Sequence, residues 1–156
     1  MKKTISLLLL IISMVIIGVS ADAKGSKANN GKPLTQYVFV QVDTDGATLR
    51  DASDMSRILK SYGFTVSPVK MQGNKEIFTA SRNGTTIKFV NVEGDSKCTI
   101  TFRTQAEVNI FVESLINSHW IKKGSRYEHP NNNYAMDCTT IFASVNGRTV
   151  VLDAPF

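Results

Sequence analysis

Histidine, cysteine and tryptophan are scarce in this chain, with two, two and one among 156 residues. A metal site built from clustered histidines or paired cysteines would have few ligands to use, and the chain has no C-x-x-C motif. The nucleophile motif G-x-S-x-G and a glycine-rich phosphate loop are also missing. We therefore assign no catalytic, cofactor-binding or metal-binding residues. The sequence leaves enzymatic activity open but favours its absence.

Charge of one sign is in only modest excess. The chain has 18 Lys and Arg against 13 Asp and Glu, a net charge of +5. The basic residues are scattered, and their densest group is Lys122, Lys123 and Arg126. Nucleic-acid surfaces usually combine a dense basic patch with aromatic side chains, so we expect no nucleic-acid partner.

The sequence has one long hydrophobic run, residues 5–19, which follows Lys2 and Lys3 and precedes the small residues of V-S-A-D-A. This layout is typical of a secretory signal peptide over residues 1–23. An uncleaved anchor is the alternative, but the run is short for a membrane span of about 20 residues. We expect an exported protein, periplasmic or secreted in a bacterium, with no membrane attachment after cleavage.

Cleavage before Asp22 or Lys24 is expected, and removal of residues 1–23 leaves 133 residues with a net charge of +4. Residues 24–33 are largely polar and contain glycine, so we predict a flexible linker over residues 24–34. Residues 35–156 have the length of a single domain.

Two similar stretches, T-A-S-R-N-G-T-T-I at 79–87 and F-A-S-V-N-G-R-T-V at 142–150, each place Asn-Gly between β-rich runs. Asn-Gly is the strongest short signal for a two-residue hairpin turn. With Asn83-Gly84 as the turn, apolar pairs fall on one face and polar pairs on the other. With Asn146-Gly147 as the turn, Phe142 is predicted to face Val151.

Upstream of each hairpin lie a predicted strand and a predicted helix. The strands are Tyr37–Val42 and Cys98–Arg103, and D-T-D-G at 43–46 is read as the turn from the first strand into its helix. The first helix has apolar residues from Leu49 to Tyr62, with Gly63 as its C-terminal cap, and the second follows Thr104.

The order strand, helix, β hairpin therefore occurs twice, which predicts an internal duplication with repeat one at about 36–95 and repeat two at about 96–156. We predict an α+β fold with a mostly antiparallel sheet of six to eight strands and two helices packed on one face. We align the two helix ends as Leu59–Tyr62 and Ile116–His119.

In an exported protein the two cysteines, Cys98 and Cys138, are expected to form a disulfide. One pattern conflicts with this. Cys98 falls on the same predicted strand face as the apolar Ile100 and Phe102. Cys138 falls on the strand face opposite to that of the apolar Ile141. A bulge or an irregular start to the strand near Asp137 would remove the conflict.

The sheet face away from the helices is the candidate binding face. It is predicted to carry Thr79, Ser81, Thr86, Lys88, Phe142, Ser144 and Val151. Tyr37 or Phe39 is expected to extend the apolar pair of Phe142 and Val151 from the first strand. We expect an exported, non-enzymatic binding or inhibitor-like module whose partner is a protein or a small ligand. One alternative is an enzyme or metal-dependent protein using dispersed residues such as Glu128, His129 and Asp137. Another is a structural envelope protein that forms a homodimer through this face or an edge strand.

Overall fold

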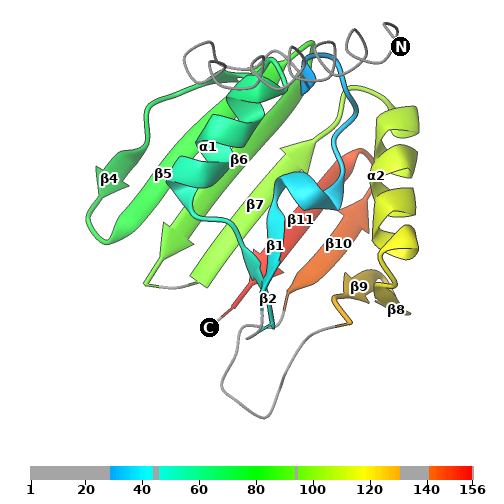
Figure 1. Cartoon of the computed structure of the whole chain (residues 1–156). Coiled ribbons are helices and arrows are strands. Elements are labelled where there is room, and N and C mark those ends of the chain that lie inside the picture. The colour runs from blue at the N-terminus through cyan, green and yellow to red at the C-terminus, as the bar shows by residue number, and fades with distance from the viewer. Residues whose placement is uncertain (1–28, 44–45, 94, 131–140, 156) are drawn as a thin grey trace, which may run out of the picture.

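The chain forms a mostly antiparallel sheet with two α-helices on one face (Figure 1). The computed structural model describes residues 29–43, 46–93, 95–130 and 141–155. The main sheet has nine strands in the order β3-β5-β6-β7-β11-β10-β9-β8, and β4 also pairs with β5. The elements are η3 (Gln36–Val38), β1 (Val40–Asp43), β2 (Gly46–Leu49), α1 (Ala52–Ser61), β3 (Thr65–Val66), β4 (Lys70–Gln72), β5 (Lys75–Arg82), β6 (Thr85–Val92), β7 (Asp95–Thr101), α2 (Gln105–Asn117), β8 (Ile121–Lys123), β9 (Arg126–Glu128), β10 (Phe142–Asn146) and β11 (Thr149–Ala154). The prediction of an α+β fold with a mostly antiparallel sheet and two helices is confirmed, but the described residues form a main sheet of nine strands rather than six to eight.

The hydrophobic core lies between the sheet and the helices. Phe89, Cys98 and Leu152 stand in register on β6, β7 and β11, and all three are buried. Helices α1 and α2, with the short β1–β2 hairpin between them, cover this face (Figure 1). Phe111 of α2 packs against Phe39 at a ring-centroid distance of 6.0 Å and against Phe102 at 5.6 Å. The core therefore joins α2 to both the sheet and the N-terminal segment.

The first hairpin has the predicted turn and register. Phe78 pairs with Phe89, and Ala80 pairs with Ile87. Asn83 and Gly84 have φ values of 48° and 85°, the two positive φ angles that a type I′ turn requires. The alternation of apolar and polar residues then places Phe78 and Ala80 on the core face.

The predicted register of the second hairpin is wrong. Asn146 pairs with Thr149, so the two-residue turn is Gly147-Arg148 rather than Asn146-Gly147. Gly147 has a φ of 55°, as expected for the first central residue of a type II′ turn. Partners shift by two residues, and Phe142 faces Asp153 instead of Val151. A two-residue shift keeps every side chain on its predicted face.

The prediction of a strand from Tyr37 to Val42 is also wrong in part. Residues 36–38 form a 3-10 helix, and β1 pairs only with β2, in a separate two-stranded sheet. Asp43 at the end of β1 pairs with Gly46 at the start of β2, so D-T-D-G leads into a strand rather than a helix. Leu49 lies in β2, and α1 begins at Ala52 because the Asp51 side chain caps it by accepting a hydrogen bond from the Asp54 amide.

The domain also extends into the segment predicted to be a linker. Leu34 is buried in the core, and the backbone carbonyl of Lys32 accepts a hydrogen bond from Arg82 at 3.0 Å. The burial of Leu34 explains why this part of the segment packs on the domain. An apolar side chain that enters the core offsets the entropy lost on ordering, whereas a purely polar segment has no such gain.

Both helices end in the same hydrogen-bond motif. In α1 the Phe64 amide donates to Leu59 and the Gly63 amide to Lys60. In α2 the Trp120 amide donates to Leu115 and the His119 amide to Ile116. This is the Schellman pattern, with the left-handed residue after the C-cap. Gly63 as the C-terminal cap is confirmed, with a φ of 82°.

The motif corrects the predicted alignment of the helix ends by one residue. Leu59 corresponds to Leu115 rather than to Ile116, and Gly63 corresponds to His119. His119 has a φ of 61°, so a histidine stands where its equivalent is glycine. The left-handed conformation costs an ordinary L-residue about 1–2 kcal/mol.

We expect His119→Gly to raise the free energy of unfolding by about 1 kcal/mol, because glycine adopts this conformation without steric cost. His119 is exposed, so its side chain gives up little packing. His119→Val should lower stability, since a β-branched residue tolerates positive φ poorly. Urea unfolding of both variants measures the change. A lower stability of the glycine variant would contradict this account of the helix end.

Candidate functional site

The face of the main sheet that points away from α1 and α2, here called the open face, carries polar rows across its strands. In one row Ser81, Thr86 and Thr101 stand in register on β5, β6 and β7. The next row contains Thr79, Lys88, Thr99, Val151, Ser144 and Arg126. Apart from Val151, this row from β5 to β9 consists of hydroxyl-bearing and cationic residues.

One half of the open face is hollowed into a groove. Its larger part has a volume of about 510 Å³ and its smaller part about 320 Å³. Ser67, Thr79 and Lys88 line both parts, so the two are continuous. The volumes lie within the roughly 300–1,000 Å³ typical of small-ligand sites. The other side chains of the open face that line the groove are Thr65, Lys70, Gln72, Ile77, Ser81, Thr86, Thr99 and Thr101.

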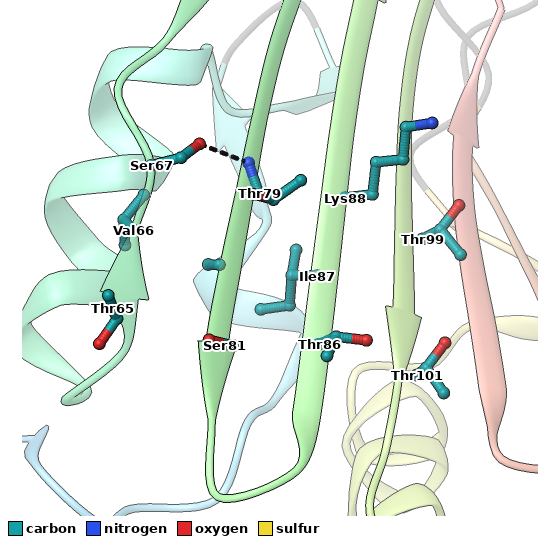
Figure 2. Close-up of a pocket in the computed structure, with 11 residues that line it drawn as sticks. Thr65, Val66, Ser67, Thr79, Ser81, Thr86, Ile87, Lys88, Thr99 and Thr101 are labelled. Carbon is teal, nitrogen blue, oxygen red and sulfur yellow. Dashed lines mark hydrogen bonds between the residues drawn. The ribbon is translucent and has the colours of Figure 1, made fainter.

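The wall of the groove is a break in the edge strand. β3 and β4 both pair with β5, and residues 67–69 separate them. Pro68 has no amide proton to continue the ladder. Ser67 replaces the missing strand contact: its hydroxyl accepts from the Thr79 amide at 3.0 Å, and its amide donates to the Thr79 carbonyl at 2.9 Å. The contact from Ser67 to Thr79 is drawn in Figure 2.

The hydroxyl groups of the groove are available to a ligand. Figure 2 shows Thr79, Thr86, Thr99 and Thr101 on three neighbouring strands around Lys88. Within the described part of the chain, none of these four threonine hydroxyls has a hydrogen-bond partner. A hydroxyl can both donate and accept, so the row can match ligand groups of either kind.

The groove is also the region of unpaired positive charge. Register places six basic residues and three acidic residues on the open face, an excess of three positive charges. Asp153 is paired with Lys97, and Glu128 with Lys123 and Arg126. The acidic residues of the face are Asp95, Glu128 and Asp153, and the basic ones are Lys70, Lys75, Lys88, Lys97, Lys123 and Arg126.

Three of these lysines, Lys70, Lys75 and Lys88, have no ion-pair or hydrogen-bond partner among the residues that the structure describes. Lys70 and Lys88 line the groove, and Lys75 lies beside it on β5. No Asp or Glu is among the described residues that line it. The groove therefore favours a negatively charged ligand group.

The predicted residues Phe142 and Val151 lie on the other half of the open face. Both are half-buried, and they are diagonal neighbours rather than a facing pair. The Arg126 guanidinium lies over the Phe142 ring at 4.1 Å from its centroid. Phe142 therefore has a packing partner, whereas Val151 borders the groove through its register with Thr99.

Tyr37 and Phe39 do not extend the open face, and that part of the prediction is wrong. Phe39 is fully buried against Phe111, on the helix side of the sheet. Tyr37 is 61% exposed, but its hydroxyl lies 2.7 Å from the Ser118 hydroxyl at the end of α2. The cause is the placement of this segment between the two helices instead of in the main sheet (Figure 1).

Of the dispersed set Glu128, His129 and Asp137, the two residues that the structure describes, Glu128 and His129, lie on opposite sides of the sheet. Alternation along the strand places Glu128 on the open face with Arg126, whereas His129 lies on the core side against the Trp120 ring at 5.0 Å. Burial lowers the pKa of His129. Asp137 lies outside the described residues. Among the residues described, no group of three His, Cys, Asp or Glu side chains could hold a metal ion.

The predicted disulfide stays a prediction, because Cys138 lies outside the described residues. Cys98 is fully buried on the core face, and this burial raises the pKa of its thiol. A low thiolate fraction makes Cys98 a poor nucleophile. A partner cysteine would have to reach the core side of β7.

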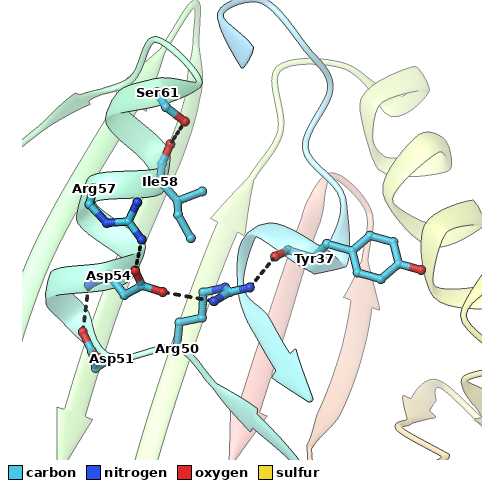
Figure 3. Close-up of polar contacts among 7 residues, drawn as sticks. All are labelled: Tyr37, Arg50, Asp51, Asp54, Arg57, Ile58 and Ser61. Atoms are coloured by element: carbon cyan, nitrogen blue, oxygen red, sulfur yellow. Dashed lines mark hydrogen bonds and ion pairs between the residues drawn. The ribbon is translucent and has the colours of Figure 1, made fainter. Parts of the chain in front are cut away.

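A charged cluster on the helix side has a structural role (Figure 3). Arg50 donates to Asp54 at 3.0 Å and to the Tyr37 carbonyl at 3.4 Å, and Arg57 also binds Asp54. Hydrogen bonding to Arg57 lowers the pKa of the Asp54 carboxyl below 3.8. This contribution to stability is present above that pH and is lost as the pH falls through the lowered pKa. The cluster ties α1 to the 3-10 helix.

Sequence reasoning placed Thr79, Ser81, Thr86 and Lys88 on the open face but not the rest of the groove. The C-T-I-T alternation predicts Thr99 and Thr101 opposite Ile100, yet it does not reveal which strand stands beside β7. The signal for the groove wall was Pro68, which interrupts an otherwise β-rich stretch.

Among the described residues no helix is long and apolar enough to cross a membrane. Comparison with known proteins adds no relative: no protein-family model, no curated protein and no solved structure matches this chain.

Proposed function

We propose that the chain is an exported, non-enzymatic binding module that holds its partner in the groove of the open face. The observation that carries the proposal is a groove lined by unpartnered threonine hydroxyls around Lys88, on the face that the helices leave uncovered. All of its lining residues except Ser67 come from β strands, and a sheet holds such a surface rigid and pre-formed. Rigid sites lose less entropy on binding.

The side chains that line the groove also argue against enzymatic activity. Among the residues that the structure describes, its lining has hydroxyls and ammonium groups but no histidine, cysteine or carboxylate that would serve as a general base. Activation of a threonine as a nucleophile needs such a base close by. Recognition is the chemistry that these residues support best.

The test is to fill the groove without changing its charge. Thr86→Phe places a ring in the larger part of the groove, and Ser144→Phe places the same ring on the open face outside it. Both positions are exposed, so folding should be nearly unchanged. We expect Thr86→Phe to weaken capture about tenfold or more, equivalent to 1.4 kcal/mol. The capture experiment uses immobilised full-length mature protein and the exported fraction, read by mass spectrometry.

Two results would contradict the proposal. Equal capture by the wild type and Thr86→Phe would show that the groove is not used. Loss of capture by Ser144→Phe alone would move the site to the half of the open face that contains Phe142. Thermal unfolding of each variant shows whether it remains folded.

Export is part of the proposal, and it rests on the charged start, apolar run and small residues of segment 1–23. We expect N-terminal sequencing of the mature protein to begin near Asp22 or Lys24. Intact Met1 in a soluble intracellular fraction would contradict export.

We also infer that the fold arose by internal duplication. Both helices end in the same motif, and both hairpins lie in one sheet on either side of β7. The two halves differ in their first strand, since β7 pairs within the main sheet and β1 does not. The helix ends and hairpins are the elements that superposition of residues 37–92 on 98–153 should overlay.

A further inference from the structure

We propose that the groove binds an acidic saccharide, with a sugar carboxylate on Lys88 and sugar hydroxyls on the surrounding threonines. This inference rests on the proposed function and specifies its ligand class. Three observations carry it: the distribution of charge, the unpartnered hydroxyls and the position of the groove in the sheet.

The distribution of charge favours an anion. Lys88 stands in register between Thr79 on β5 and Thr99 on β7, so it is the middle residue of the three that this row contributes to the groove. Lys70 lines the adjoining smaller part of the groove. Because the described lining has no acidic side chain, a ligand carboxylate would meet two cations without a competing partner from these residues.

The hydroxyls favour a ligand rich in hydroxyl groups. Directly opposed residues on neighbouring strands lie about 4.5–5.5 Å apart. Thr86 and Thr101 therefore present neighbouring hydroxyls that can donate to or accept from the same sugar ring. A simple inorganic anion would use the lysines but would leave most of this row without a partner.

The position of the groove disfavours other anionic partners. A peptide usually adds to a sheet edge by backbone hydrogen bonds. β6 and β7 are inner strands whose backbone ladders are already paired on both sides. Single-stranded nucleic acid needs aromatic side chains for base stacking, and the open-face residues of this groove include none.

The experiment titrates the full mature protein with an oligogalacturonate and, as a matched neutral ligand, with its methyl ester. Backbone amide shifts in NMR spectra report the site. We expect the acid form to bind, with shifts centred on Lys88, Thr99 and Thr101, and the ester to bind at least several-fold more weakly. Affinity should fall as salt rises, because exposed charges are screened.

Two variants test the charge. Lys88→Gln should weaken binding about fivefold, the upper effect of one exposed ion pair, and adding Lys70→Gln should weaken it further. Lys60→Gln is the matched control, since Lys60 lies in the last turn of α1 on the other side of the sheet. This control removes the same charge and should leave affinity unchanged.

Several outcomes would overturn the inference. They are equal binding of acid and ester, an equal loss of affinity in Lys60→Gln, shifts centred outside the groove, or binding of hexaglutamate as tight as that of the oligogalacturonate. Absence of oligogalacturonate binding would overturn it as well. If Thr86→Phe still abolished capture in that case, the groove would be a binding site for another ligand, and only the ligand class would be wrong.

Discussion

Replacing Phe111 by alanine is expected to lower the free energy of unfolding by about 3–5 kcal/mol. Phe111 is fully buried, and its ring contacts both Phe39 and Phe102. The substitution would leave a cavity where α2, the N-terminal segment and the strand end after β7 meet. Because small domains are stable by only about 5–15 kcal/mol, the variant should unfold at clearly lower urea concentration.

The matched control is Ile116→Ala on the same helix. Ile116 is 56% exposed, so its truncation should change stability by about 0.5 kcal/mol or less. Urea unfolding followed by circular dichroism compares the two. Similar losses in both variants would mean that α2 does not pack through Phe111.

The second prediction concerns equivalent positions in the two helices. Leu59 and Leu115 are both fully buried. The backbone carbonyl of each accepts a hydrogen bond from the amide five residues later, Phe64 or Trp120, in its helix-end motif. Leu59→Ala and Leu115→Ala should each lower the free energy of unfolding by about 2–5 kcal/mol. Each leucine also packs where the residue two beyond the C-cap, Phe64 or Trp120, returns to the core.

The comparison between the two leucine variants is informative in itself. Comparable losses are expected if the helix ends have the same role in both halves. A large loss for one variant and almost none for the other would contradict the equivalence of Leu59 and Leu115. Ile116→Ala again serves as the exposed control, because the uncorrected alignment would have paired Ile116 with Leu59.

Local signals predicted the parts of the fold that depend on local chemistry. The Asn83-Gly84 turn, the capping of α2 by Thr104 and the glycine after α1 are confirmed. Each depends on a backbone angle or hydrogen bond within a few residues. Local sequence does not fix the position of the turn in the second hairpin. Asn146-Gly147 and Gly147-Arg148 are both suitable turn pairs, and both registers keep Ala143 on the core face.

The remaining errors come from tertiary contacts. Y-V-F-V-Q-V has the composition of a strand, but Val38, Phe39 and Val40 are all buried, as consecutive residues of a central strand with one solvated face would not be. This segment packs between α1 and α2. The groove was equally hidden, because it depends on β3 and β4 both pairing with β5, which no local pattern specifies.

The position of β11 has a consequence for how the protein is made. β11 follows all the other described strands in sequence, yet it lies inside the sheet between β7 and β10. During synthesis, β5, β6 and β7 can pair in order, but the free side of β7 has no partner until residues 149–154 emerge. An unpaired strand edge is a template for aggregation. A nascent chain arrested before Thr149 should therefore need a chaperone, and the mature sheet closes only when its last strand is inserted.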